Sequence, residues 1–321
     1  MVLTHQQSAL QQTQIPVQTT DMKDKSILRE GVVIKAISGF YYVSDSVNTF
    51  ECKARGNFRY SKISPIVGDR VKFNAVSEKT GVIVEISPRK NSLNRPVIAN
   101  IDKLIIISSF KNPAPDLYLI DRLTAIAVFN NIVPIIVFNK SDMGDFNEFA
   151  RIYKNAGFNT YIVSAFDNKS LADLKEEFKN CICAMTGNTG VGKSSLINSM
   201  FNGFELKTGE ISSALGRGRH TTRHTELFSN ELGGYVADTP GFSSIEQSDD
   251  LYNFKLQLPR CFRDFLPYLD NCKFSTCTHT SEPGCGVLRA VNSGFIEKTR
   301  HNSYVTLLNE LKSVTGWQKK K

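Results

Sequence analysis

The string GNTGVGKS at residues 187–194 matches the loop pattern G-x-x-x-x-G-K-[ST], which binds nucleotide phosphates. It follows a strand-like run, CICAMT, and opens a helical stretch with one apolar face. In that context backbone N–H groups hold phosphate, the lysine ammonium approaches the β- and γ-oxygens, and the serine hydroxyl ligates Mg²⁺. The motif predicts a nucleoside triphosphate site at Gly187, Asn188, Thr189, Gly190, Val191, Gly192, Lys193, Ser194 and Ser195, without naming the base.

A second string, NKSD at residues 139–142, follows the run VPIIVF, at the carboxyl end of a predicted strand where open α/β sheets bind ligands. Asp142 can accept hydrogen bonds from the N1–H and 2-amino groups of guanine, and adenine offers neither donor. An unpaired buried carboxylate disfavours adenine about a hundredfold. We expect Lys140 to lie along the base and the phosphate loop, and Asn139 to brace the two segments. Taken alone, the string fits a helix N-cap equally well.

Two further strings favour guanine. VSAFD at residues 163–167 places Ser164 and Ala165 after a strand, where a backbone N–H can reach the guanine O6. DTPG follows the strand-like run GGYVA, and Asp238 suits the outer shell of Mg²⁺. The N–H of Gly241 suits the γ-phosphate. Together with NKSD and the phosphate loop, these strings predict a GTPase.

The loop string GRGRHTTRH at residues 216–224 lies between the phosphate loop and DTPG, and either Thr221 or Thr222 can complete the Mg²⁺ shell. Phe242 follows DTPG and cannot position water as the glutamine of Ras-like enzymes does, so we expect slow intrinsic turnover. His220 is the candidate to orient the water, with a solvated loop histidine as the equal alternative. Three arginines of this string are predicted to contact an external phosphate backbone, and stabilisation of the transition state is the alternative role. They are Arg217, Arg219 and Arg223.

The order of these motifs is rotated, since the base strings precede the phosphate loop instead of following it. A sheet does not require one chain order, because surface termini can be rejoined elsewhere. The sequence therefore predicts a circularly permuted GTPase. The chain after DTPG runs directly into the C-terminal region, so we expect a γ-phosphate-dependent change at Gly241 to set the pose of that region.

A cluster of potential metal ligands follows, Cys272-x4-Cys277-x-His279-x5-Cys285. Thiolates with one imidazole favour Zn²⁺, and four protein ligands indicate a closed structural site rather than a catalytic one. Unrelated buried thiols are the alternative. The other four cysteines are isolated or lie in apolar runs and are predicted to pack in cores. They are Cys52, Cys181, Cys183 and Cys261.

The composition excludes several classes of protein. With 321 residues and 41% hydrophobic residues, the chain can form two or three packed domains. A formal charge of +8 indicates a polyanionic partner, either nucleic acid or an anionic membrane. No apolar run reaches the length of a membrane span, and the N-terminus lacks the features of a secretory signal. The seven cysteines are an odd number and argue for a reducing compartment, so we expect a cytoplasmic protein.

The composition and the hydrophobic pattern of the chain predict four segments. Residues 1–26 form a flexible tail, and residues 27–92 contain five β-rich runs typical of an oligonucleotide-binding (OB) barrel, with an SH3-like barrel as the alternative. This stretch, taken through Arg95, holds 12 basic against 6 acidic residues. Residues 93–250 alternate strands and helices in an α/β pattern, and residues 251–321 are mainly helical around the zinc site. The last segment carries a second basic face that includes Arg289, Lys298 and Arg300.

These strings together resemble the ribosome small-subunit-dependent GTPase A family (RsgA, also called YjeQ). The resemblance also rests on RGNFR at 55–59, VGDRV at 67–71 and RKNSLNRP at 89–96, and it covers the chain from about residue 27. It implies GTP hydrolysis stimulated by the small ribosomal subunit, a role in late subunit maturation, and rRNA contacts by the barrel and zinc domains. Candidate RNA contacts are Arg55, Arg59, Arg217, Arg219 and Arg223.

The leading hypothesis is therefore a monomeric GTPase with Mg²⁺-bound GTP or GDP, one structural zinc, the small subunit and its rRNA as partner, and no membrane partner. One alternative is a nucleic-acid-binding module in which nucleotide is a static ligand. Phe242 is compatible with it, whereas the phosphate and Mg²⁺ ligands argue against it, namely Lys193, Ser194, Thr221 or Thr222, and Asp238. Another is an ATP-dependent RNA remodeller, which Asp142 argues against.

Overall fold

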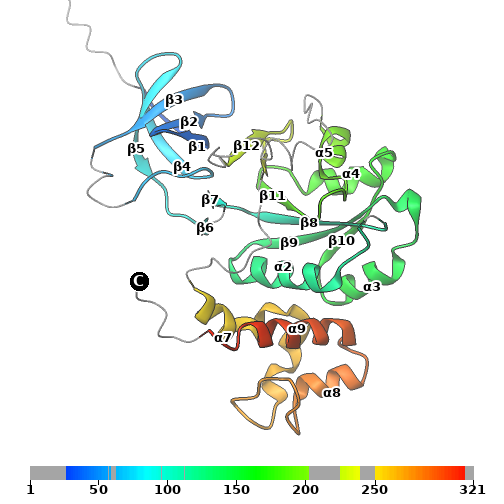
Figure 1. The fold of residues 1–321 in the computed structure, drawn as a ribbon. Helices are drawn as coiled ribbons and strands as arrows, with labels where there is room; N and C mark the ends of the chain where they lie inside the picture. Colours follow the sequence, from blue (N-terminus) through cyan, green and yellow to red (C-terminus); the bar gives the residue numbers. More distant parts are fainter. Residues whose placement is uncertain are drawn as a thin grey trace, which may run out of the picture.

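The computed structural model describes residues 27–56, 58, 63–94, 96–111, 113–201, 225–238 and 250–314. Figure 1 shows three parts: a small barrel, a central sheet covered by helices, and a helical C-terminal part beside that cover. This confirms the predicted architecture. The predicted flexible tail, residues 1–26, lies outside the described residues.

The first part is a closed five-stranded barrel, as predicted. Its strands hydrogen-bond in the order β1-β2-β3-β5-β4, and pairing of β1 with β4 closes the ring. Alternate side chains point inward, so a period-two sequence fills the barrel with apolar groups. At its centre Phe50 and Phe73 pack with ring centroids 5.0 Å apart. The strands are β1 (Ile27–Ile37), β2 (Phe40–Ser44), β3 (Thr49–Ala54), β4 (Arg70–Ala75) and β5 (Thr80–Ile86).

A short hairpin, β6 (Ser92–Asn94) and β7 (Val97–Ala99), follows the barrel. It stays against the barrel because Ala99 N donates to Val67 O at 2.8 Å and Asn100 Nδ2 donates to Gly68 O at 2.9 Å. The predicted division between the first two domains at residue 92 falls at the start of this hairpin.

The central sheet has the strand order β10-β9-β8-β11-β13-β12. Its last strand, β12, pairs with β1 of the barrel, so the barrel and the GTPase domain form one continuous sheet. Strands β10, β9, β8, β11 and β13 are parallel, and β12 is antiparallel to β13. The predicted strands after Pro96 are all present. The strands are β8 (Lys103–Ser109), β9 (Val133–Asn139), β10 (Asn159–Ile162), β11 (Ile182–Thr186), β12 (Glu226–Ser229) and β13 (Tyr235–Asp238).

Helices cover both faces of this sheet, which explains why its central strands β9 and β11 are buried along almost their whole length. On one face α2 and α3 pack on Leu104, Ile136 and Phe138. On the other face α4 and α5 pack on Ile107 and Val137. The helical elements are α2 (Leu117–Phe129), the short η1 (Ser141–Met143), α3 (Asn147–Asn155), α4 (Asn168–Glu176) and α5 (Lys193–Met200).

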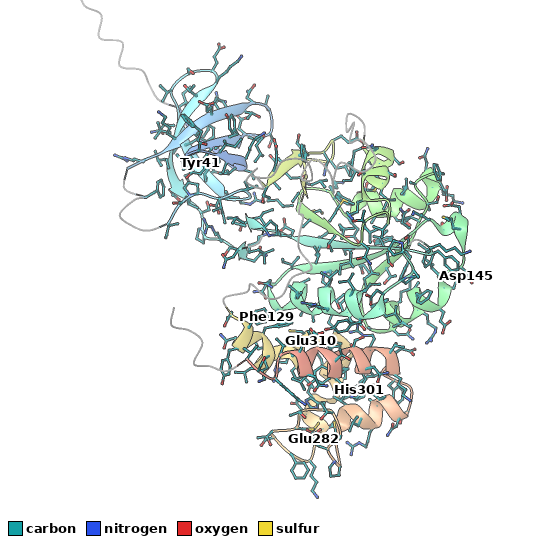
Figure 2. The ribbon with its side chains drawn as sticks, in the orientation of Figure 1. Tyr41, Phe129, Asp145, Glu282, His301 and Glu310 are labelled. Carbon is teal, nitrogen blue, oxygen red and sulfur yellow. The ribbon has the colours of Figure 1, made fainter. Side chains whose placement is uncertain are left out.

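The C-terminal part lies on the outer side of α2 (Figure 1). Figure 2 labels Phe129 on α2 and Glu310 on the last helix, and the Phe129 ring meets Phe254 with centroids 5.1 Å apart. The elements are α7 (Leu251–Cys261), η3 (Arg263–Asn271), α8 (Gly286–Asn292) and α9 (Lys298–Glu310). None of the helices in the described segments is long and apolar enough to cross a membrane.

Candidate nucleotide and metal sites

The phosphate loop connects β11 to α5, as its sequence context predicts. Three of its glycines have positive φ, with Gly187 at 146°, Gly190 at 86° and Gly192 at 94°. A Cβ at Gly187 would lie 2.2 Å from the Ile107 carbonyl oxygen, so only glycine fits there. Val191 is 1% exposed and anchors the loop in the core below it. The loop therefore has a fixed base and an exposed crest at Asn188, Thr189 and Gly190.

The charged and hydroxyl groups of this motif lie where the loop turns into α5. Lys193 Nζ donates to the carbonyl oxygens of Gly187 at 2.7 Å and Asn188 at 3.0 Å, so its side chain crosses over the loop. Ser194 begins the buried side of the helix and is 7% exposed, and Ser195 is half-buried next to it. The lysine thus sits beside the loop backbone that is predicted to receive phosphate.

The NKSD segment is bound directly to the phosphate loop. Asn139 ends β9, and its Nδ2 donates to Val191 O at 2.8 Å. Lys140 is left-handed, with φ at 64°, and its Nζ donates to Gly190 O at 2.6 Å. A Cβ at Gly192 would lie 2.4 Å from Asn139 Nδ2. Two strings 50 residues apart in sequence therefore form one unit, in the arrangement expected for Asn139 and Lys140.

Asp142 meets the VSAFD segment at the same end of the sheet. The Ser164 hydroxyl donates to Asp142 Oδ1 at 2.6 Å and accepts from Phe166 N at 3.3 Å. Ser141 N donates to Val163 O at 3.1 Å, which ties the two loops by their backbones. Ser164 is 4% exposed, and Ala165 follows it at the surface edge. The structure thus brings Asp142 and Ser164 into direct contact and ties the NKSD segment to the VSAFD segment.

Several predicted site residues lie outside the described residues. They belong to the segment 202–224, to residues 239–249, or to the short break after Gly56. The backbone of Asp238 ends β13, where it pairs with Glu226, but its side chain is not described. Arg55 is described and exposed. The predicted residues outside the description are Arg59, Arg217, Arg219, His220, Thr221, Thr222, Arg223 and Gly241.

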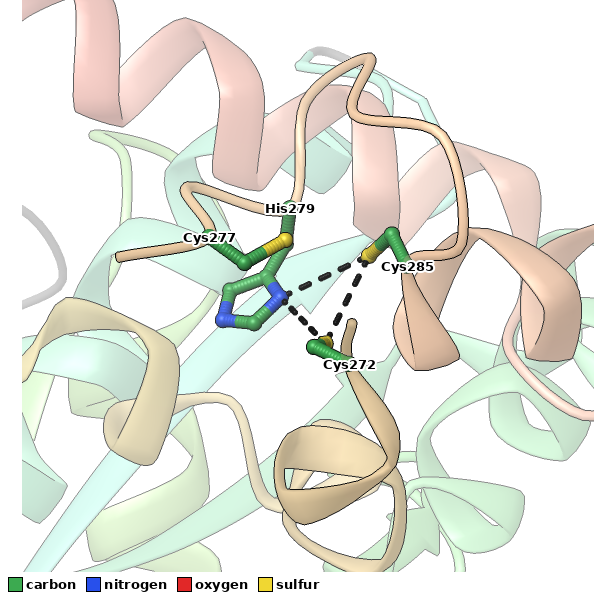
Figure 3. A group of neighbouring side chains, drawn as sticks. All are labelled: Cys272, Cys277, His279 and Cys285. Atoms are coloured by element: carbon green, nitrogen blue, oxygen red, sulfur yellow. Dashed lines mark hydrogen bonds between the residues drawn. The ribbon is translucent and has the colours of Figure 1, made fainter. Parts of the chain in front are cut away.

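The Cys₃His string forms a compact cluster (Figure 3). One ligand atom from each of Cys272, Cys277, His279 and Cys285 lies within 4.8 Å of all the others. His279 Nδ1 is 3.5 Å from the sulfurs of Cys272 and Cys285, and those two sulfurs are 3.9 Å apart. A tetrahedral zinc with Zn–S bonds near 2.3 Å sets its sulfurs about 3.8 Å apart. The cluster therefore fits a closed zinc site, and no other such group occurs in the described part of the chain.

Neighbouring groups hold the ligands in place. The N–H groups of Gly286 and Leu288 donate to the sulfurs of Cys272 and Cys285 at 3.3 and 3.4 Å. His301 Nε2 donates to His279 O at 2.8 Å, and the Tyr304 hydroxyl donates to Thr278 O at 2.8 Å. Both donors belong to α9, so that helix supports the metal loop from behind.

Burial tunes the protonation of these ligands. It raises the pKa of Cys277 to about 12 and lowers the pKa of His279. A neutral imidazole suits metal ligation, whereas thiolates in this setting need a cation beside them. Burial therefore keeps the imidazole neutral, as metal ligation requires, and a bound metal would have to displace the thiol protons.

A buried arginine was missed by the sequence analysis, which counted Arg300 in a basic surface. That prediction is wrong, because Arg300 is 1% exposed. Its guanidinium donates to Asp121 Oδ1 at 2.6 Å and to both carboxylate oxygens of Asp264 at 2.7 and 2.8 Å. It also lies over the rings of Phe158 and Phe262, at 5.3 and 5.1 Å from their centroids. Arg300 joins the C-terminal part to the GTPase domain.

Comparison with known proteins identifies relatives for nearly the whole chain. A family model described as the RsgA GTPase matches residues 86–248, and one described as the RsgA N-terminal domain matches residues 30–83. A protein of Caldanaerobacter subterraneus subsp. tengcongensis named "Small ribosomal subunit biogenesis GTPase RsgA" is 42% identical over 88% of this chain and 96% of its own. A Bacillus subtilis protein of the same name is 41% identical over 88% of this chain and 97% of its own.

Solved structures give the same result. The crystal structure of "YloQ, a circularly permuted GTPase" is 36% identical, with a TM-score of 0.74 over 89% of this chain and 96% of that one. The crystal structure of YjeQ from Thermotoga maritima is 32% identical, with a TM-score of 0.76 over 90% of this chain and all of that one. The circular permutation predicted from motif order is thereby confirmed.

Proposed function

Because the chain belongs to the RsgA GTPase family, and is therefore a GTP hydrolase, we propose that it acts in late maturation of the small ribosomal subunit. It binds the subunit, its GTPase activity rises on binding, and it works as a cytoplasmic monomer. The names of the relatives, which refer to small-subunit biogenesis, support this role.

One observation carries the proposal for the nucleotide site: the base loop is hydrogen-bonded to the phosphate loop. Asn139 and Lys140 reach the carbonyl oxygens of Val191 and Gly190, which fixes the distance between the ends of a bound nucleotide. Asp142 lies at the far end, held by Ser164. Its free carboxylate oxygen lone pairs suit the two guanine donors.

The phosphate end is proposed to consist of residues 187–195. Lys193 now contacts the carbonyl oxygens of Gly187 and Asn188 and can turn to phosphate oxygens within reach of the same loop. Ser194, Asp238 and one of Thr221 and Thr222 are assigned to Mg²⁺, which neutralises the charge that develops on the phosphates. Gly241 is assigned to the γ-phosphate. These assignments follow the motif and the start of α5 at Lys193.

We assign to His220 the role of orienting the attacking water. The isolated protein hydrolyses GTP slowly. The barrel and the zinc domain supply the rRNA contacts, and the residues assigned to them are Arg55, Arg59, Arg217, Arg219 and Arg223. Arg55 is exposed at the end of β3, as a phosphate contact requires. The zinc proposed for Cys272, Cys277, His279 and Cys285 is structural, because four protein ligands leave no open position.

Phosphate release from GTP and from ATP, each with and without small ribosomal subunits, tests the proposal. We expect slow release from GTP alone, faster release with subunits, and little from ATP. Equal rates with and without subunits would refute the ribosomal role and favour a static nucleotide module. Faster release from ATP would favour an RNA remodeller instead.

Base selection is tested by Asp142→Asn. The amide keeps one acceptor and adds a donor, so we expect about a hundredfold loss of GTP affinity and a gain for xanthosine triphosphate, whose C2 carbonyl accepts. Asp145→Asn is the matched control, since Asp145 is exposed in the same loop and accepts a hydrogen bond from Asn147 N. Unchanged GTP affinity in Asp142→Asn would remove this residue from the base site.

A further inference from the structure

Two cysteines lie side by side at the beginning of β11. Cys181 and Cys183 are two residues apart, so in an extended strand their side chains share one face. Their sulfurs are 3.5 Å apart. The sequence predicted that both pack in the core, and Cys183 does so at 0% exposure. Cys181, however, is only half-buried and reaches the surface.

The surroundings of this pair of thiols give Cys181 and Cys183 different acidities. Lys103 of the neighbouring strand pairs with Cys183 in register, and its Nζ donates to Glu177 O at 2.8 Å. The Cys181 thiol approaches the same carbonyl oxygen at 3.2 Å. The hydrogen bond with Cys183, aided by the Lys103 charge, lowers the pKa of Cys181, whereas the same bond and burial raise that of Cys183.

We propose that Cys181 and Cys183 form a peroxide-reactive dithiol that closes to a reversible disulfide. The Cys181 thiolate attacks hydrogen peroxide, which breaks the O–O bond and gives a sulfenic acid and hydroxide. The Cys183 sulfur then attacks the Cys181 sulfur, forms the S–S bond and releases water. Peroxide is the oxidant, and a small thiol reverses the reaction by exchange.

Closing this bond must bend β11. The sulfurs move from 3.5 Å to a bond of about 2.05 Å. Alternate Cα atoms of an extended strand are about 6.6 Å apart, near the upper limit for a disulfide. Cys183 is paired with both Lys103 and Val236, and β11 enters the phosphate loop at Gly187. The disulfide therefore strains the strand that leads into the phosphate loop, and we expect this strain to weaken nucleotide binding. That expectation rests on the proposed function of the loop.

The chemistry is tested by peptide mapping of the full-length, zinc-loaded protein after treatment with hydrogen peroxide. Trypsin releases one peptide, residues 180–193, that contains both cysteines. We expect this peptide to become two hydrogen atoms lighter and to revert with a thiol reductant. In Cys183→Ser, a cyclic 1,3-diketone should trap the sulfenic acid on Cys181.

Cys52 and Cys261 serve as internal controls, because both are buried free thiols and burial raises the pKa of each to about 12. We expect them to remain reduced while the 180–193 peptide oxidises. Oxidation of these two thiols at the same rate, or a 180–193 peptide of unchanged mass, would overturn the proposal.

The link to the phosphate loop has its own readout. Oxidised protein should bind GDP severalfold more weakly than reduced protein, and Cys181→Ser treated in the same way should not change. A disulfide that leaves GDP affinity unchanged would overturn the link. Failure of the reduced protein to bind GDP would contradict the proposed function instead. In that case the mass of the 180–193 peptide would still show whether the disulfide forms.

Discussion

Two flanking parts of the molecule are attached to the GTPase domain by different kinds of contact: the C-terminal part, residues 250–314, called the zinc domain after its proposed metal, and the barrel. The zinc domain packs an apolar surface on α2 and inserts Arg300 between Asp121 and Asp264. The barrel continues the GTPase sheet, with β1 paired to β12 and Lys35 bound to Glu226 at 2.9 Å. Both members of that ion pair are about one-third exposed, whereas Arg300 and Asp121 are essentially inaccessible.

This difference predicts which flanking domain responds more to a bound nucleotide. Strand β12 follows the segment that holds the threonines assigned to Mg²⁺, and its partner β13 ends at Asp238, so the barrel is paired with a strand between these assigned residues. The zinc domain rests on α2, on the outer side of the sheet. The sequence predicted that nucleotide sets the pose of the zinc domain through residues 239–249, which lie outside the described residues. The described contacts favour the barrel as the more responsive domain.

Removal of zinc is expected to have the largest effect. Structural zinc contributes on the order of 10 kcal/mol to the folding of small zinc domains. Because α9 carries Arg300 together with His301 and Tyr304, loss of the metal loop should also loosen the contact with α2. We expect about one zinc per chain by metal analysis, and faster amide exchange in α8 and α9 after chelation.

The barrel is the control within the same molecule. Its strands contact no metal ligand, so their amide exchange should be unchanged by chelation. Purified protein without zinc, or equal loss of protection in the barrel and in α9, would contradict the comparison.

Arg300→Met should have the next largest effect. The substitution leaves two buried carboxylates without their cation, which destabilises a protein by about 3–5 kcal/mol. Chemical denaturation followed by circular dichroism measures this loss of stability. Arg151→Ala is the matched control, because Arg151 joins Glu297 across the same interface but is 52% exposed. Its cost should be below about 1 kcal/mol; equal costs would show that burial of Arg300 is unimportant.

The sequence predicted what depends on local pattern. The five runs of the barrel, the strand before the phosphate loop and the Cys₃His spacing all lie within short stretches, so periodicity and spacing suffice to find them. The pairing of Arg300 with Asp121 spans 179 residues, and a sequence displays a charge but not its burial. For the same reason Cys181, in an apolar run, was assigned to the core although it reaches the surface.

The smallest effect is expected from the barrel contact. A double-mutant cycle of Lys35→Met and Glu226→Gln should give a coupling energy of about 0.2–1 kcal/mol, since both side chains are partly solvated. Lys72 and Glu85, an ion pair 3.1 Å apart between β4 and β5, provide the control within the barrel. If β12 responds to nucleotide, the Lys35–Glu226 coupling should differ between GDP and a non-hydrolysable GTP analogue, while the Lys72–Glu85 coupling stays constant. Identical values with both nucleotides would contradict the expected response of the barrel to nucleotide.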